Sequence, residues 1–251
     1  MRLLLLGAFV AYAVALAAAL ACRGLRSVVA IPRVRPGGAP VSRVLIIGAT
    51  GGTGRQLLAQ ALEQGRMVTA LVRNPEKLTV THPHLIVTRG DVLDYGTVEK
   101  AVQGQDAVIC ALGHRRYFHP TRILSDGTRN ILAAMEAHGV RRFVCETSLG
   151  IGDSAGRLGL YYTFFVIPVI LPFYFWDKTR QERAIASSKA EWVIVRPGVL
   201  TNGARRGAVR HGRSVGGLLA SVRISRADVA HFMLQQLADD AYLGTAVGIC
   251  R

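Results

Sequence analysis

Residues 44–54 read Val44-Leu-Ile-Ile-Gly48-Ala-Thr-Gly51-Gly-Thr-Gly54, an apolar run that passes directly into a glycine-rich turn. The residues that follow, 55–62, have the spacing of an amphipathic helix. A strand, a glycine turn and a helix in this order form the phosphate-binding start of a dinucleotide-binding domain, with phosphate held at the helix N-terminus. The alternative is a turn that only joins a strand to a helix. We expect a dinucleotide to be bound by the turn residues Gly48, Thr50, Gly51, Gly52, Thr53 and Gly54.

Beyond this turn, short β-branched runs alternate with helical stretches, the order that βαβ units produce. We expect strands near 43–48, 67–72, 84–88, 106–111, 141–147, 192–196 and 246–250, and helices near 52–65, 95–103, 122–138, 178–189 and 226–239. The chain of 251 residues is long enough for one such domain with its own core. The predicted fold is therefore α/β, a Rossmann-type doubly wound parallel sheet in a single domain (43–251), preceded by an N-terminal apolar helix.

The N-terminal segment from Leu3 to Cys22 carries no charge and is long enough to span a bilayer. Several arginines follow it and only Arg2 precedes it, so the positive-inside rule places the domain in the cytoplasm. We expect a transmembrane anchor at 1–22 and a basic linker at 23–42. The alternative is a signal or targeting peptide cleaved near Cys22, because Ala19-Leu-Ala21 has the small-x-small form of a cleavage site.

The formal net charge is +15, which favours anionic partners such as a nucleotide phosphate or a membrane surface with anionic lipids. The sequence has no zinc-finger spacing and no RNP-like motif, which argues against a nucleic-acid partner. The four cysteines, Cys22, Cys110, Cys145 and Cys250, have no metal-binding spacing. We expect no metal site, no disulfide and no catalytic thiol.

Residues 44–58 resemble the opening of atypical short-chain dehydrogenases of the NmrA-like and biliverdin-reductase-B-like group, whose phosphate loop reads GATGxxG. The resemblance extends over most of residues 43–240. Further matches occur at 70–74, 90–92, 111–113, 147–148, 196–198 and 224–230. The resemblance implies an NAD(P)H-binding protein in which Asp91 and Val92 flank the adenine and the segment Ala111, Leu112 and Gly113 lines the cofactor. From its sequence alone, Asp91 could equally cap a turn.

Arg73 follows the second strand, where an NAD-specific site needs an acidic residue for the ribose 2′-hydroxyl group. An arginine there suits a 2′-phosphate. The sequence therefore favours NADP(H) over NAD, with a solvated surface arginine as the alternative.

Tyr174-Phe-Trp-Asp-Lys178 has the Tyr-x-x-x-Lys spacing of short-chain reductases, and Ser148 follows the fifth strand. In such enzymes the lysine lowers the pKa of the tyrosine, and the phenol protonates the substrate oxygen. Tyr174 ends a very apolar run, so it could also be an interfacial aromatic. We treat Ser148, Tyr174 and Lys178 as the candidate catalytic residues.

Residues 158–176 form an uncharged run that contains Pro168 and Pro172. Spanning a bilayer would divide the sheet between two compartments, so we expect an apolar lid over the substrate cleft, an insertion into one leaflet, or buried core. The resulting hypothesis is a membrane-anchored NADPH-dependent oxidoreductase that acts on an apolar carbonyl or quinone-like substrate. The alternative is a non-catalytic NADP(H)-binding sensor or assembly factor. A sugar epimerase is less favoured because the C-terminal part is short.

Overall fold

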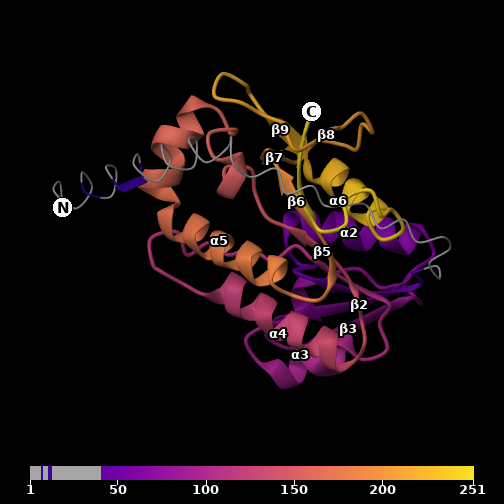
Figure 1. Ribbon diagram of the computed structural model, residues 1–251. Coiled ribbons are helices and arrows are strands. Elements are labelled where there is room, and N and C mark those ends of the chain that lie inside the picture. The colour runs from indigo at the N-terminus through magenta and orange to yellow at the C-terminus, as the bar shows by residue number, and fades with distance from the viewer. Residues whose placement is uncertain (1–6, 8–10, 13–40) are drawn as a thin grey trace.

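The computed structural model describes Gly7, Ala11, Tyr12 and residues 41–251. Apart from Gly7, Ala11 and Tyr12, the expected anchor (1–22) lies outside the described residues, as does the linker (23–42) up to residue 40. The described chain forms an eight-stranded sheet with the order β3-β2-β1-β4-β5-β6-β10-β8 (Figure 1). All its pairings are parallel except that of β10 with β8. The strands are β1 Arg43–Ile47, β2 Met67–Val72, β3 Leu85–Arg89, β4 Ala107–Cys110, β5 Arg142–Glu146, β6 Glu191–Pro197, β8 Arg210–Gly212 and β10 Thr245–Cys250.

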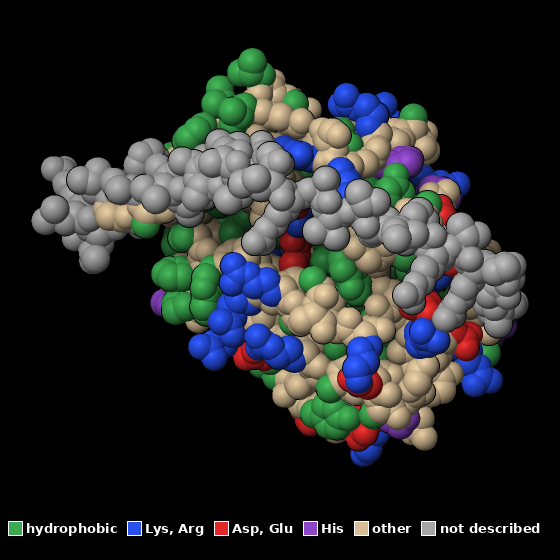
Figure 2. Space-filling model, viewed as in Figure 1, with side chains coloured by type: hydrophobic (Ala, Val, Ile, Leu, Met, Phe, Trp, Pro, Cys, Tyr) green, Lys and Arg blue, Asp and Glu red, His purple; other side chains and the backbone are tan. Residues whose placement is uncertain are grey.

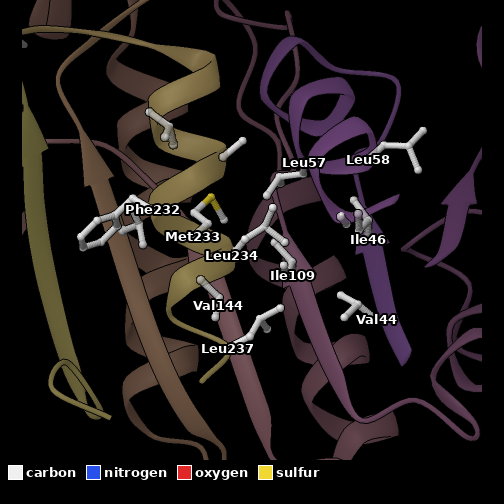
Figure 3. Close-up of a cluster of buried hydrophobic side chains, with 14 of the residues drawn as sticks. Val44, Ile46, Leu57, Leu58, Ile109, Val144, Phe232, Met233, Leu234 and Leu237 are labelled. Carbon is white, nitrogen blue, oxygen red and sulfur yellow. The ribbon is translucent and has the colours of Figure 1, made fainter. Parts of the chain in front are cut away.

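Helices cover both faces of the sheet, which confirms the doubly wound Rossmann-type fold. They are α2 Gly52–Glu63, α3 Tyr95–Val102, α4 Ile123–Ala137, α5 Pro172–Ala186 and α6 Arg226–Gln235. Alternate residues of β1 serve the two cores: Val44 and Ile46 pack with α2 and α6, whereas Leu45 and Ile47 pack with α3, α4 and α5. Figure 3 shows the first of these cores, where Leu57 of α2 and Met233 of α6 lie over the strands.

The region between β5 and β6 differs most from the expectation. A helix was predicted to begin near residue 178, but α5 begins at Pro172. Proline is tolerated in the first turn of a helix because the N–H group that it lacks would have no hydrogen-bond partner within the helix. A π-helix, η4 Tyr162–Ile170, precedes it and contains Pro168. The run is therefore not one regular α-helix, but Pro172 begins a helix instead of interrupting one.

Several short elements were not anticipated. The strands β7 Val199–Thr201 and β9 Arg223–Ser225 form a separate two-stranded sheet, and β8 has only three residues. Two 3₁₀ turns, η2 Pro75–Lys77 and η3 Gly152–Ser154, complete the order. Segments of this length carry too few residues to show a period of two.

The described residues contain no helix that is both long and apolar enough to cross a membrane. The run 158–176 is divided: Leu158, Ile167 and Phe175 join a buried cluster, while other side chains of the same run are exposed. Cys110, Cys145 and Cys250 are buried and free, as expected, and Cys22 lies outside the described residues. Within the described part of the chain, no group of acidic, histidine or cysteine side chains is arranged to hold a metal.

Candidate functional site

The glycine turn joins β1 to α2 at the carboxyl edge of the sheet. Gly48 has φ = +86°, a left-handed conformation that favours glycine, and a Cβ there would lie 2.5 Å from the carbonyl oxygen of Ala111. Gly54 is packed even more closely, since its Cβ would lie 2.0 Å from the Gly48 carbonyl oxygen. Gly48 therefore permits the tight turn, and Gly54 permits the close packing of α2 on the end of β1.

Gly51 and Gly52 face outward from the same turn and are exposed. Gly51 occupies the N-cap position of α2, and no side chain of the described residues caps this helix. The first N–H groups of α2 and the positive end of its dipole are thus available to an anion. The turn fits the pyrophosphate of a dinucleotide.

Arg226, the first residue of α6, lies across this turn. A Cβ on Gly52 would be 2.5 Å from Arg226 Cδ and 2.6 Å from its Nε, and the Nη1 atom donates a 2.5 Å hydrogen bond to Asn202 Oδ1. Its positive charge also lowers the pKa of Glu146, although burial of that carboxyl group dominates and leaves the pKa raised. Arg226 therefore brings a cation from the far end of the chain to the phosphate turn. Sequence reasoning noted this residue only as part of a family match.

Glu146 ends β5 and is buried beneath the turn. The hydroxyl group of Thr53 donates a 3.0 Å hydrogen bond to Glu146 Oε1, which ties the first turn of α2 to β5. Thr53 thus turns inward and Thr50 remains half-buried. The Thr53 hydroxyl group is thus engaged by the protein, and phosphate binding by Thr53 stays a prediction that its backbone N–H could fulfil.

Arg73 directly follows β2, where its side chain is exposed. Near it, Arg55 of α2 donates a 3.3 Å hydrogen bond from Nη2 to the carbonyl oxygen of Lys77. This bond ties α2 to the segment after β2. Arg73 thus follows the strand end at which the adenosine ribose of a dinucleotide lies in this fold.

Asp91 and Val92 follow β3 and have structural contacts of their own. Asp91 Oδ1 accepts a 3.0 Å hydrogen bond from the Leu93 N–H, so this carboxylate closes a turn. Val92 is 7% exposed and packs against Gly127 of α4, whose Cβ would lie 2.7 Å from it. The contacts of both residues therefore hold the segment after β3 against α4, and their role beside an adenine stays a prediction.

β4 is followed by the segment Ala111, Leu112 and Gly113. This segment lies beside the glycine turn, since the Ala111 N–H donates a 2.9 Å hydrogen bond to the carbonyl oxygen of Ile47, the residue before Gly48. The hydroxyl oxygen of Tyr174 is 3.5 Å from where a Gly113 Cβ would be. The structure thus brings Tyr174 of α5 to the end of β4.

Lys178, one turn further along α5, is 2% exposed. Its Nζ donates hydrogen bonds to the carbonyl oxygens of Glu146 at 2.9 Å and Leu112 at 3.4 Å, and it lies 5.8 Å from the centre of the Tyr174 ring. Burial opposes the charge of Lys178, but Tyr174 and Glu146 outweigh it and raise its pKa. Lys178 therefore places a positive charge at the ends of β4 and β5.

Tyr174 lies in an aromatic group with His114 and Tyr117, at ring distances of 5.0 and 5.9 Å. Burial raises the pKa of Tyr174, with Lys178 acting in the opposite direction, so the phenol keeps its proton at neutral pH. Burial also lowers the pKa of His114, whose Nδ1 accepts a 3.1 Å hydrogen bond from the Arg116 N–H. His114 was not predicted, although it directly follows the 111–113 segment.

Ser148 follows β5 and is half-buried. Its hydroxyl group donates a 2.9 Å hydrogen bond to the Leu149 carbonyl oxygen. The neighbouring Thr147 is buried and donates at 2.6 Å to Glu182 Oε1, a carboxylate that Arg196 also holds through two hydrogen bonds. Ser148 is therefore the hydroxyl group at this strand end that remains partly accessible.

The comparisons agree with this geometry. Residues 48–240 match the model of a family described as NAD(P)H-binding. A chloroplastic, uncharacterized protein of Arabidopsis thaliana is 33% identical over 173 residues, which cover 64% of this chain and 60% of the plant protein. The chain thus spans less than two thirds of that relative's length.

Solved structures share the fold. ChuY, an anaerobillin reductase from Escherichia coli O157:H7, aligns with a TM-score of 0.69 and 24% identity over 83% of this chain and 96% of ChuY. A short-chain dehydrogenase/reductase from Veillonella parvula, solved in complex with NADP, aligns with a TM-score of 0.70 and 18% identity over 84% of this chain and 95% of its own.

Proposed function

Because the chain belongs to the NAD(P)H-binding family of atypical short-chain dehydrogenase type, we propose that it is an NADPH-dependent oxidoreductase. The proposed substrate is an apolar carbonyl or quinone-like compound. The observation that carries this proposal is the convergence of Tyr174 and Lys178 on the ends of β4 and β5, beside the glycine turn. In parallel α/β sheets, ligands bind at this edge.

The glycine turn and Arg226 would hold the pyrophosphate, and Arg73 would select NADPH through its 2′-phosphate. Bound NADPH supplies a hydride ion for the carbonyl carbon of the substrate. Tyr174 would donate its phenolic proton to the carbonyl oxygen, so that a carbonyl group, a hydride and a proton give an alcohol. Tyr174 carries its phenolic proton at neutral pH, and Lys178 would favour its release by opposing the effect of burial on the pKa of Tyr174. Solvent would restore the proton.

Apolar side chains surround this proton donor. Leu149, Ile167 and Phe175 form a buried cluster against which Tyr174 packs. The preference for an apolar substrate rests on this cluster, since a polar substrate would lose hydration there without gaining partners. We further propose that residues 1–22 anchor the domain to a membrane with the domain in the cytoplasm, as their length and flanking charges indicate.

A second candidate function is NADP(H) binding without turnover. The hydrogen bonds within the site favour this function. The Ser148 hydroxyl group and Lys178 Nζ both donate to backbone carbonyl oxygens, so neither donor points to an open position for a substrate. Ser148 as the oxyanion partner of the substrate would have to break its bond to Leu149.

The test measures NADPH binding and NADPH oxidation in the same full-length preparation. NADPH fluorescence reports binding, and absorbance reports oxidation with a panel of quinones and hydrophobic carbonyl compounds. Oxidation that depends on an apolar acceptor supports the reductase. Tight binding without oxidation across the panel favours the sensor, and absence of binding rejects both.

A further inference from the structure

Helix α5 presents two chemically different faces. Tyr174, Lys178 and Gln181 point into the protein, and Lys178 and Gln181 are at most 2% exposed. On the opposite side, Phe173, Trp176, Arg180 and Arg183 follow a 3-4-3 spacing, which places them in one stripe. The stripe begins with two aromatic side chains and continues with two arginines.

The aromatic end of this stripe joins a larger apolar surface. Phe164 and Phe165 of η4 are 41% and 48% exposed, and Trp176 is 43% exposed. The loop that carries Leu218 and Leu219 is attached to the same region, because the Leu160 N–H bonds to the Leu218 carbonyl oxygen at 2.7 Å. We call these residues, with Phe173, the apolar surface. Isolated exposed apolar side chains are ordinary, but a contiguous group marks an interaction site.

The arginine end of the stripe lines a groove of about 770 Å³ between α4 and α5. Its charged lining residues are Arg129, Arg141, Arg180, Arg183, Lys189 and Glu136. The Arg180 guanidinium lies 4.9 Å from the centre of the Trp176 ring, and its buried Nε has no hydrogen-bond partner among the described residues. Figure 2 shows hydrophobic side chains beside Lys and Arg side chains on this part of the molecule.

We propose that the apolar surface and the adjoining arginines dock the domain onto an anionic lipid bilayer. Aromatic side chains of the stripe would enter the headgroup region, and Arg180 and Arg183 would meet lipid phosphates. Tryptophan next to arginine suits this boundary, since each has an apolar body and a polar end. A second copy of the chain fits less well because it would bring two sets of like charges together.

This proposal rests on the proposed membrane location and specifies which face meets the membrane. Tyr174 and Trp176 lie two residues apart on opposite sides of α5, so docking through Trp176 would place the proton donor close to the bilayer. A lipophilic substrate could then enter from the lipid phase.

The test uses the full chain reconstituted with vesicles of phosphatidylcholine that has brominated acyl chains. One set of vesicles also contains phosphatidylglycerol, which makes it anionic. The chain has two tryptophans, and Trp192 packs against the core, so Trp176 is the one that lipid can reach. Bromine should quench Trp176 emission in anionic vesicles, and Trp176→Phe should remove the quenched component. The paired change Arg180→Gln and Arg183→Gln should lower the ratio of docked to undocked domains about 25-fold, because each surface arginine contributes about fivefold.

The matched control pair, Arg205→Gln and Arg210→Gln, removes the same charge from the region around β8 and should leave quenching unchanged. Flotation of the vesicles reports the anchor separately. If the chain floats with the vesicles but its tryptophan emission is not quenched, the proposed docking surface is rejected and the proposed anchor is retained. A chain that fails to float on anionic vesicles, while still binding NADPH, rejects both anchor and docking surface but not the oxidoreductase.

Discussion

Lys178 Nζ donates a 2.9 Å hydrogen bond to the carbonyl oxygen of Glu146, and this bond joins α5 to the end of β5. The same Nζ reaches the end of β4 through Leu112. A single buried cation thus spans the two strand ends between which the reacting part of a bound dinucleotide lies in this fold. Lys178 therefore contributes both to the packing of the site and to its electrostatics.

Lys178→Met should lower NADPH oxidation by about 100-fold or more, because the charge that supports proton transfer is lost. Unfolding should become easier by about 1–3 kcal/mol, since two carbonyl oxygens lose a donor. Stopped-flow oxidation rates and urea unfolding measure the two effects. Lys189→Met is the matched control, because Lys189 is exposed and, within the part of the chain that the structure describes, its side chain bonds to Glu136 alone, at 2.7 Å. Equal rates in both variants would remove Lys178 from the proposed mechanism.

Arg73→Ala should reduce the preference for NADPH over NADH by about 10- to 100-fold, the range expected for one charge-assisted contact to phosphate. The affinity for 2′-AMP should fall in parallel, while that for ADP-ribose, which has no 2′-phosphate, should not change. Fluorescence titration and calorimetry measure these constants. An unchanged NADPH preference would mean that Arg73 is only a solvated surface residue.

Arg226→Gln should have the opposite pattern, because Arg226 lies beside the pyrophosphate turn. The affinity for ADP-ribose should fall about tenfold or more, and that for 2′-AMP, which has no pyrophosphate, should stay the same. Arg226→Lys should recover part of the loss through its charge. A loss that is equal for both ligands would indicate a general disturbance of α6 instead.

Gly54→Ala should destabilise the fold by about 3 kcal/mol or more, because the new Cβ would meet the backbone of the turn at 2.0 Å. Gly51→Ala is the matched variant: its Cβ would lie 3.2 Å from the Gly48 carbonyl oxygen, and its φ of −76° suits alanine. It should fold and bind NADPH more weakly. Thermal unfolding with and without NADPH distinguishes the two glycines, and similar melting curves would contradict the prediction.

Glu146 should make the stability of the protein depend on pH. Burial raises its pKa above the ordinary value of 4.5, so the folded state holds this proton more tightly than the unfolded state does. Stability from Glu146 therefore falls as pH rises from about 4.5 through the raised pKa. Glu146→Gln removes the titrating carboxyl group. As pH rises from about 4.5 through the raised pKa of Glu146, the unfolding free energy of the variant should therefore increase relative to that of the wild type. Urea titrations between about pH 4 and about pH 8 measure it, and parallel curves would exclude this role for Glu146.

The doubly wound parallel sheet and seven of its eight strands could be predicted because those strands carry a local signal, whereas β8 was not anticipated. Four apolar residues of β1 stand directly before the glycines, and α2, α3 and α4 have apolar residues at helical spacing. The start of α5 was placed too late because Pro172 was interpreted as an interruption. The same residue is well tolerated at the beginning of a helix.

Parts of the site that depend on contacts between distant segments were less predictable. Arg226 reaches Gly52 from 174 positions away, and no local pattern in either segment indicates this contact. His114 stands next to a predicted cofactor segment, but only the fold shows that it packs on Tyr174. The bond from the Thr53 hydroxyl group to Glu146 was not predictable either, because it joins α2 to β5 across 93 positions.

The position of β10 in the sheet has a consequence for synthesis. This strand, residues 245–250, lies between β6 and β8 and pairs with both. While a ribosome is still making these residues, β6 has an open edge that another nascent strand could join. The sheet is complete only after this strand has left the exit tunnel, so we expect chaperones to be needed most in the interval between the synthesis of β6 and that of β10.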